Sequence, residues 1–274
     1  SMSHMAQTST SLDESNVART NNVRLAAASI NGTILNPGDE FSYNTVVGER
    51  TEARGYRPAG AYVNGQVVDE FGGGVCQPSS TLYMAVLRAD LEVTERHNHS
   101  FTVAYTPLGE DATVDYGNLD FRFKNNTDYP IKILAEQTDG KMIMTIVGTK
   151  TSDKSVETRT EVLETYTPQT IEKKDSSMMA GQTRVDTTPI TGYSTRTYKV
   201  ITENGKTTEV LANTSNYVKR DKVVYVGTKQ PAPTTPQTPA TSGGTEASGE
   251  SASDGEQATA GETADTASDT QSDS

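Results

Sequence analysis

The chain has 274 residues, of which only 33% are apolar, with no Trp, a single Cys and a formal net charge of −12. So low an apolar fraction indicates that part of the chain does not fold, and eight acidic residues after Lys229 leave about −4 on the rest. The absence of a basic patch argues against a nucleic-acid partner, and one cysteine excludes an internal disulfide.

The opening SMSHM is typical of residues left by an expression vector, so we expect residues 1–14 to be a scar and a flexible lead. The natural start is then missing. A membrane is expected as a partner only through an anchor that preceded this sequence.

Residues 15–150 alternate apolar runs with turn signals. Helical spacing of apolar residues predicts a helix over residues 22–30, and Asn64-Gly65 between two β-rich runs predicts a hairpin. Ser79 and Ser80 are candidate N-caps of a second helix that ends near Leu91.

The rest of this segment reads as strands. One is expected from residue 92 through His97 and His99 to residue 105, and others over residues 112–117, 119–125, 129–137 and 142–149. We therefore predict an α+β catalytic domain over residues 15–150, with early helices and a late antiparallel sheet.

Residues 155–228 show no sequence pattern typical of a helix. Thr, Val and Tyr alternate with polar residues, and Asn204-Gly205 predicts another hairpin, so we expect an elongated all-β module. Residues 229–274 are rich in Pro and Thr, then in Gly, Ser and acidic residues, and are expected to form a disordered acidic tail.

The only cysteine, Cys76, follows three glycines and precedes a helix, in FGGGVCQPSS. Unpaired N–H groups at a helix N-terminus stabilise a thiolate, and the N–H groups from Val75 to Gln77 could form an oxyanion hole. A helix of about 18 Å and a returning strand of about 20 Å bring His97 and His99 back to the level of Cys76. Thiolate, base and oxyanion donors together favour acyl transfer through a thioester.

Three other interpretations stay open at this point. Cys76 could be a small buried apolar residue, or Cys76, His97 and His99 could be three zinc ligands with an open fourth position. The histidines could also be strand residues that pair with Asp111, Asp115 or Asp120.

Three blocks in order, RTNNVRLAAASINGTILNPGDEFSYN, GGGVCQPSSTLYMAVL and LDFRFKNNTDYPI, resemble the VanW domain of Gram-positive bacteria, from about Arg19 to Ile133. The sequence departs from the family at Pro78. The resemblance implies a peptidoglycan L,D-transpeptidase without a cofactor or metal, with Cys76 as nucleophile, His99 as base, His97 in support and Asp111 orienting the imidazole. The residues expected around the substrate and oxyanion are Gly73, Gly74, Val75, Gln77, Ser79, Ser80 and Arg96.

The second module resembles the G-five domain, with Gly181, Gly192 and Gly227 at glycine positions of that family. This resemblance implies binding of cell-wall glycan. The expected partners are peptidoglycan stem peptides and glycan. The expected location is extracellular, at the cell wall or the outer face of the membrane of a Gram-positive bacterium. The alternatives are a non-catalytic wall-binding protein and a zinc-dependent amidase or peptidase.

Overall fold

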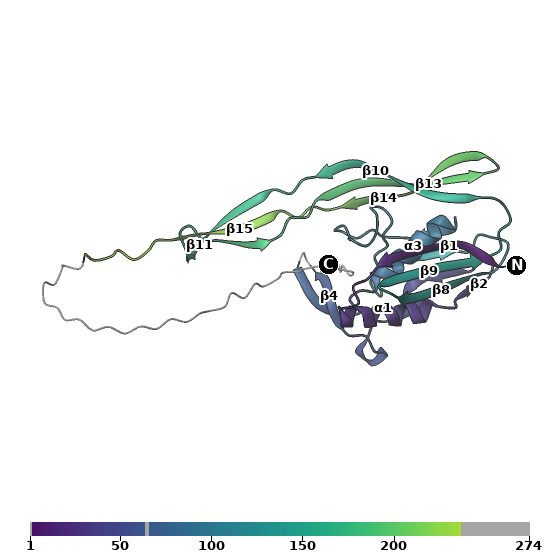
Figure 1. Ribbon diagram of the computed structural model, residues 1–274, viewed down its shortest axis with the longest axis horizontal. Coiled ribbons are helices and arrows are strands. Elements are labelled where there is room, and N and C mark those ends of the chain that lie inside the picture. The colour runs from purple at the N-terminus through teal and green to yellow at the C-terminus, as the bar shows by residue number, and fades with distance from the viewer. Residues whose placement is uncertain (1, 64–65, 237–274) are drawn as a thin grey trace, which may run out of the picture.

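The computed structural model describes residues 2–63 and 66–236, and it is mostly β-strand with few helices (Figure 1). The helices are α1 (Val17–Ile30), α2 (Tyr43–Val47), α3 (Cys76–Arg88) and a 3-10 turn (Glu52–Arg54). None of the helices in the described ranges is long and apolar enough to span a membrane.

Among the described residues up to residue 150, nine strands form three sheets. The largest sheet has the order β1-β9-β8-β2, a smaller one has the order β3-β7-β6, and β4 pairs with β5. The bounds are β1 (Ser3–Ser11), β2 (Ile34–Leu35), β3 (Glu40–Ser42), β4 (Pro58–Val63), β5 (Gln66–Phe71), β6 (Glu92–Glu95), β7 (Arg122–Lys124), β8 (Ile131–Thr138) and β9 (Lys141–Gly148).

The expectation of a flexible lead at the N-terminus is wrong for β1, which pairs antiparallel with β9. Alternate side chains of β1 face inward, because residues of a strand point to opposite faces in turn. Thr8 and Thr10 are buried there and bond to the carbonyl and hydroxyl oxygens of Thr81 in α3 at 2.7 and 2.8 Å. Hydroxyl groups satisfied by a neighbouring helix thus hold this polar segment in the sheet.

Helix α3 lies in the core of the first domain, packed against β1 and β9. It begins at Cys76, so the expectation of an N-cap at Ser79 or Ser80 is wrong, and both serines are buried inside the helix. The helix begins earlier because the preceding glycines turn the chain and the Tyr43 hydroxyl donates to the Val75 carbonyl at 2.6 Å. Pro78 is tolerated because amide groups in the first turn need no helical partner.

The segment between β6 and β7 differs most from the expected strands. Strand β6 ends at Glu95, and residues 96–121 form an irregular loop with one isolated bridge between Asp115 and Leu119. Backbone groups that would pair in a sheet form hydrogen bonds with side chains here. Asp111 accepts the His99 N–H at 2.8 Å, and Arg96 Nε donates to the Asp111 carbonyl at 2.8 Å. These local bonds override the strand-like pattern.

The second module consists of strands alone. Strands β10 (Ser155–Tyr166), β13 (Gly192–Glu203) and β14 (Lys206–Tyr217) form one sheet, and β11 (Thr170–Met179), β15 (Lys222–Lys229) and β12 (Thr183–Thr187) form another. The β13–β14 hairpin is confirmed, with positive φ at Asn204 and Gly205. Gly192 and Gly227 lie where an added Cβ would come within 2.5 Å of a neighbouring backbone oxygen.

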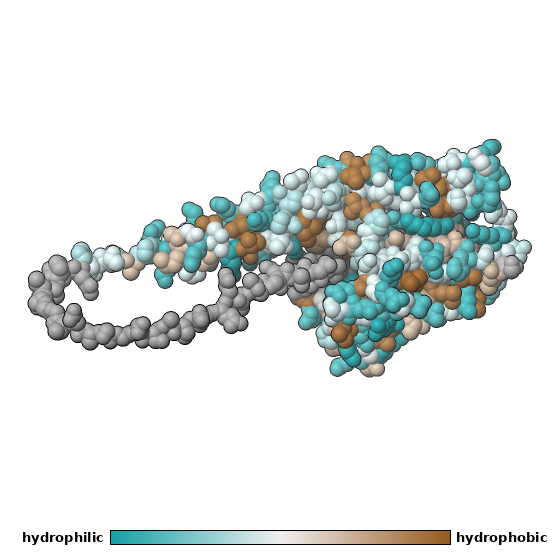
Figure 2. Space-filling model, viewed as in Figure 1, coloured by the Kyte–Doolittle hydropathy of each residue, from teal (hydrophilic) through white to brown (hydrophobic). Residues whose placement is uncertain are grey.

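The two sheets of this module follow one another along an arm (Figure 1). The sheet of β10, β13 and β14 lies alongside α3 and β1, and that of β11, β12 and β15 extends beyond the first domain. The arm surface is largely polar with separate apolar patches (Figure 2). The first domain holds the main apolar core, which includes Phe41, Leu82, Phe121 and Ile133.

Two further expectations concern residues whose structure is only partly described. The β4–β5 hairpin forms with Val63 opposite Gln66, while its turn residues 64–65 lie outside the described residues. The expected disordered tail also lies mostly outside them, from residue 237 onward.

Candidate functional site

The glycine run places Cys76 at the first position of α3. Gly72 and Gly74 have φ values of +83° and +103°, which favour glycine. Gly73 lies so close to β4 that a Cβ there would come within 2.5 Å of the Ala59 carbonyl oxygen. Asn22 of α1 donates to the Gly73 carbonyl at 2.9 Å, which fixes the turn from the other side. The position of Cys76 is therefore set by backbone packing.

The Cys76 side chain is completely buried. Its sulfur accepts a hydrogen bond from the Val114 N–H at 3.3 Å, and as a thiol it donates to the Val114 carbonyl at 3.4 Å. The Thr113 hydroxyl lies 3.5 Å from the same sulfur. A backbone N–H and a hydroxyl thus surround the sulfur with groups that can also stabilise its anion.

His99 lies beside Cys76 and is 2% exposed. Its Nδ1 lies 2.7 Å from Asp111 Oδ2, and its Nε2 is buried without a hydrogen-bond partner among the described residues. Burial lowers the pKa of His99, but the bond to Asp111 and the neighbouring Cys76 sulfur outweigh burial and raise the pKa to about 10. The imidazole is therefore protonated at neutral pH.

Asp111 is the third member of this cluster. Oδ2 faces His99, while Oδ1 accepts the Tyr217 hydroxyl and lies 3.3 Å from the Arg96 guanidinium. Burial raises the pKa of Asp111, yet the His99 and Arg96 cations and the His99 N–H lower it to about 2. Arg96 balances the carboxylate charge, and the imidazolium has the Cys76 sulfur as its other neighbour.

Two residues that the sequence did not single out lie over this cluster. The Tyr105 ring stands edge-on to the His99 ring with centroids 6.5 Å apart, and the Arg19 guanidinium lies 5.9 Å from the Tyr105 centroid. Arg19 also donates to Gln77 Oε1 at 2.9 Å. Tyr105 and Arg19 therefore connect the loop, α1 and the start of α3 around the sulfur.

His97 does not join the cluster. Its Nε2 lies 3.1 Å from Glu95 Oε2, and its side chain is 41% exposed. Cys76, His97 and His99 thus fail to converge as zinc ligands, and no group of three metal-ligating side chains occurs within the part of the chain that the structure describes.

Most of the other expected site residues are hydrogen-bonded to neighbouring groups around the start of α3. The N–H groups of Val75 and Gln77 donate to the Gly72 and Gly74 carbonyl oxygens, so in this conformation they are not open oxyanion donors. The Gln77 side chain donates to Thr10 and Ser11, and Ser80 exchanges hydrogen bonds with the Ala112 backbone. Arg96 faces Asp111, and the Ser79 hydroxyl is buried without a partner in the described ranges.

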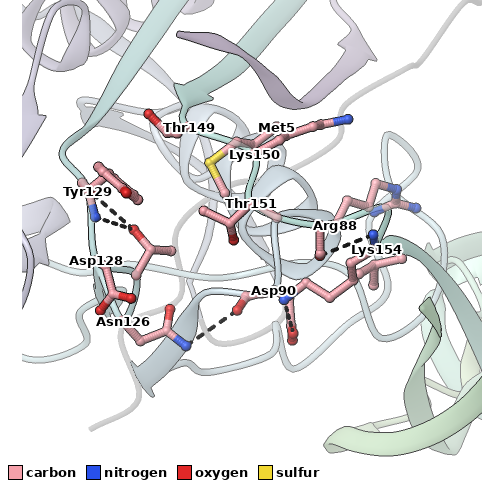
Figure 3. Close-up of a pocket in the computed structure, with 14 residues that line it drawn as sticks. Met5, Arg88, Asp90, Asn126, Asp128, Tyr129, Thr149, Lys150, Thr151 and Lys154 are labelled. Carbon is pink, nitrogen blue, oxygen red and sulfur yellow. Dashed lines mark hydrogen bonds and ion pairs between the residues drawn. The ribbon is translucent and has the colours of Figure 1, made fainter. Parts of the chain in front are cut away.

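A separate pocket of about 260 Å³ lies at the opposite end of α3 (Figure 3). Arg88 from α3, Tyr129, and Lys154 from the connection between domains contribute to its wall, and Lys154 pairs with Asp90 at 3.0 Å. Because α3 has 13 residues, this pocket is on the order of 18 Å along the helix from Cys76. It is therefore distinct from the cysteine cluster.

Sequence reasoning missed Tyr217, Tyr105, Arg19 and Thr113. Thr113 stands two residues after Asp111, so a loop that brings Asp111 to Cys76 also brings Thr113. No local pattern points to Tyr217, which is separated from Asp111 by 106 positions.

Two family models match separate parts of the chain. The model described as VanW like protein matches residues 18–147, and the G5 domain model matches residues 156–229. The chain therefore carries a VanW-like domain followed by a G5 domain.

Two curated proteins are similar to the first part of the chain. One is the uncharacterized protein YoaR of Bacillus subtilis (strain 168), 42% identical over 146 residues, which are 53% of this chain and 48% of YoaR. The other is the vancomycin B-type resistance protein VanW of Enterococcus faecalis (strain ATCC 700802 / V583), 30% identical over 134 residues, or 47% and 49% of the two chains. The chain spans about half the length of these relatives.

Two solved structures are similar to part of the chain. The G5 domain of IgA1 protease is 17% identical and covers 30% of this chain and 99% of its own, with a TM-score of 0.22. HP0197-G5 is 16% identical and covers 28% and 100%, with a TM-score of 0.18.

Proposed function

We propose that this protein is a peptidoglycan L,D-transpeptidase that acts through a Cys76 thioester. The observation that carries the proposal is the alignment of Cys76, His99 and Asp111, with a carboxylate on Nδ1 and a buried, unpartnered Nε2 beside the sulfur. A nucleophile, a base and a group that orients the base are the parts that acyl transfer requires.

In the first step, the Cys76 thiolate attacks the carbonyl carbon between the diamino acid at stem position three and the terminal D-Ala. A C–S bond forms and the C–N bond breaks. The His99 imidazolium donates its Nε2 proton to the departing D-Ala nitrogen. We assign the Cys76 N–H as the oxyanion donor, because at the first helical position it has no acceptor within its own helix.

In the second step, the amine of a neighbouring stem attacks the thioester and gives its proton to His99. The new C–N bond is a 3→3 cross-link, and the thiolate and imidazolium are restored. Water in place of the amine gives a tripeptide, so carboxypeptidation is the side reaction of the same intermediate.

Substrate access requires a movement, because the Cys76 side chain is fully buried. The segment that carries Tyr105 is the one that we propose moves. It is irregular, with no strand among the described residues between β6 and β7, and segments without strand pairing open at smaller cost than paired strands. Its Tyr105 ring stands edge-on to His99 and near the Arg19 cation.

The proposed location is the cell wall or the outer face of the membrane of a Gram-positive bacterium. Both curated relatives come from such bacteria, and one is named for vancomycin resistance. The G5 domain is proposed to bind the glycan, so that stem peptides and glycan are the partners.

The test is incubation with disaccharide-tetrapeptide muropeptides, followed by chromatography and mass spectrometry of the products. We expect D-Ala release and 3→3 dimers with the native chain and neither with Cys76→Ala. His97→Gln is the matched histidine control, because His97 lies outside the cluster, and it should retain activity. Equal products from Cys76→Ala would contradict the mechanism.

The burial of Cys76 favours a second candidate, a wall-binding protein without catalysis. In that case the pocket beside Arg88 and Tyr129 is the binding site, since it is distant from the sulfur and the Tyr129 side chain in its wall is exposed. Binding of muropeptide that Tyr129→Ala abolishes, together with no turnover, would support it over the transpeptidase.

A further inference from the structure

Strand β14 of the G5 domain presents a row of polar side chains to the first domain. Asn213, Ser215 and Tyr217 alternate along the strand and therefore lie on one face. Ser215 and Tyr217 are 3% and 1% exposed, although serine and tyrosine at the surface of an independent module would remain in water. These polar side chains therefore form part of a buried interface between the two domains.

Each member of the row has its partner in the cysteine domain. Asn213 Nδ2 donates to the Tyr83 hydroxyl at 2.6 Å and to the Gly109 carbonyl at 2.9 Å. Ser215 Oγ accepts from Arg96 at 2.8 Å. Tyr217 donates its hydroxyl to Asp111 Oδ1 and accepts the Gly109 N–H at 2.8 Å.

We propose that Tyr217 is a positioning residue of the catalytic site, supplied by the G5 domain, which holds the Asp111 carboxylate toward His99. This inference rests on the proposed function. Tyr217 takes Oδ1, so that Oδ2 is left for the N–H and Nδ1 of His99. The second domain therefore completes the site in addition to any wall binding.

The hydroxyl is suited to this role because it stays a donor at every physiological pH. Burial, together with the nearby Asp111 charge, raises the pKa of Tyr217 above its usual value. Arg96 lies 3.3 Å from the same Oδ1 and also donates from Nε to the Asp111 carbonyl, so it holds the Asp111 backbone while Tyr217 contacts only the carboxylate of that residue.

The test compares Tyr217→Phe with Tyr83→Phe. Both remove one buried hydroxyl that crosses the same interface, but only the first removes a contact to Asp111. Loss of one hydrogen bond to a charged group predicts a fall in kcat of about 10- to 100-fold with KM unchanged for Tyr217→Phe, and little change for Tyr83→Phe.

A second readout is independent of activity. In protein labelled with ¹⁵N-histidine, three histidines give resolvable signals, and the His99 Nδ1–H should be a shifted, exchange-protected resonance. We expect Tyr217→Phe to move or broaden that resonance and Tyr83→Phe to leave it in place. If Tyr217→Phe does not fold, 3-fluorotyrosine at position 217 keeps the ring and hydroxyl, is more acidic, and should also shift the His99 signal.

The outcomes separate the two claims. Equal effects of the two Phe variants on kcat and on the His99 resonance would overturn the positioning role while leaving transpeptidation in place. If the native chain shows no turnover, the proposed function fails. The His99 resonance then decides alone: a selective shift supports positioning by Tyr217, and no selective shift overturns it.

Discussion

At the scale of single residues, the candidate site is a set of buried charges that compensate one another. Asp111 is surrounded by the cations of His99 and Arg96, and the Cys76 sulfur lies on the other side of the imidazole. Removing one member of such a set leaves a buried charge without its partner, which costs far more than the net contribution of the pair. The cluster therefore depends on all its members for stability as well as for chemistry.

The stability of the chain should fall in alkali through His99. Its pKa is raised from 6.5 to about 10 in the folded protein, so its contribution is complete below pH 6.5 and is lost as pH rises toward 10. Urea unfolding at pH 6.5 and pH 10 should show a loss on the order of a few kcal/mol that His99→Gln lacks. An equal loss in both proteins would contradict the assignment.

From the sequence, Cys76 and His99 were expected to lie at the same level, because a helix followed by a return of the chain brings them together, and the family resemblance added Asp111. The structure places the three side chains in one cluster. The sequence prediction failed for His97, since the two histidines were assumed to share one strand face. The loop after Glu95 instead turns His99 inward and leaves His97 beside Glu95. Tyr217 could not be predicted, because only the docking of two domains brings it to Asp111.

At the scale of elements, the start of α3 depends on the glycine turn. Gly73→Ala places a Cβ against the Ala59 backbone, which cannot yield as a flexible side chain would. We expect a loss of about 1–3 kcal/mol in the free energy of unfolding, measured with urea. Gly117→Ala, where the added Cβ meets no atom within 4 Å, serves as the control and should lose less despite its positive φ. A smaller loss for Gly73→Ala would contradict the packing argument.

Strand β1 supports the same helix from the other side. Thr10→Val removes the acceptor of one of the two Gln77 amide hydrogens, which is then buried without a partner, and one of the two contacts of the Thr81 hydroxyl. We expect a cost of about 1–3 kcal/mol in urea unfolding. Ser9→Ala, on the exposed face of the same strand, should change stability by less than about 0.5 kcal/mol. Equal effects would mean that β1 is not coupled to α3.

Among the elements, hairpins and the sheet of β8 and β9 were predictable, because turn residues and alternation are local signals. The strand β1 was not, since its polar sequence is stabilised only by α3 and β9. The expected strands at residues 97–105 and 112–117 do not form, because polar side chains within the loop form hydrogen bonds with the backbone groups that strand pairing would need.

At the scale of the whole molecule, the cysteine domain and the adjacent G5 sheet should unfold together. Their interface includes the buried contacts of Ser215 and Tyr217, in addition to an ion pair between Arg88 and Glu110 that extends to Thr158. Calorimetry should show one transition for both, which Asn213→Ala lowers by about 2–4 °C for each kcal/mol lost. Thr208→Ala, exposed on β14, is the control. Two transitions, of which only one moves, would contradict this coupling.

The most direct test of the central claim is the intact mass of the protein during turnover of a disaccharide tetrapeptide. We predict a transient adduct equal to the substrate minus D-Ala, located on Cys76 by peptide mapping and absent from Cys76→Ala. Turnover without an adduct on Cys76, or an adduct that persists in Cys76→Ala, would contradict the thioester mechanism.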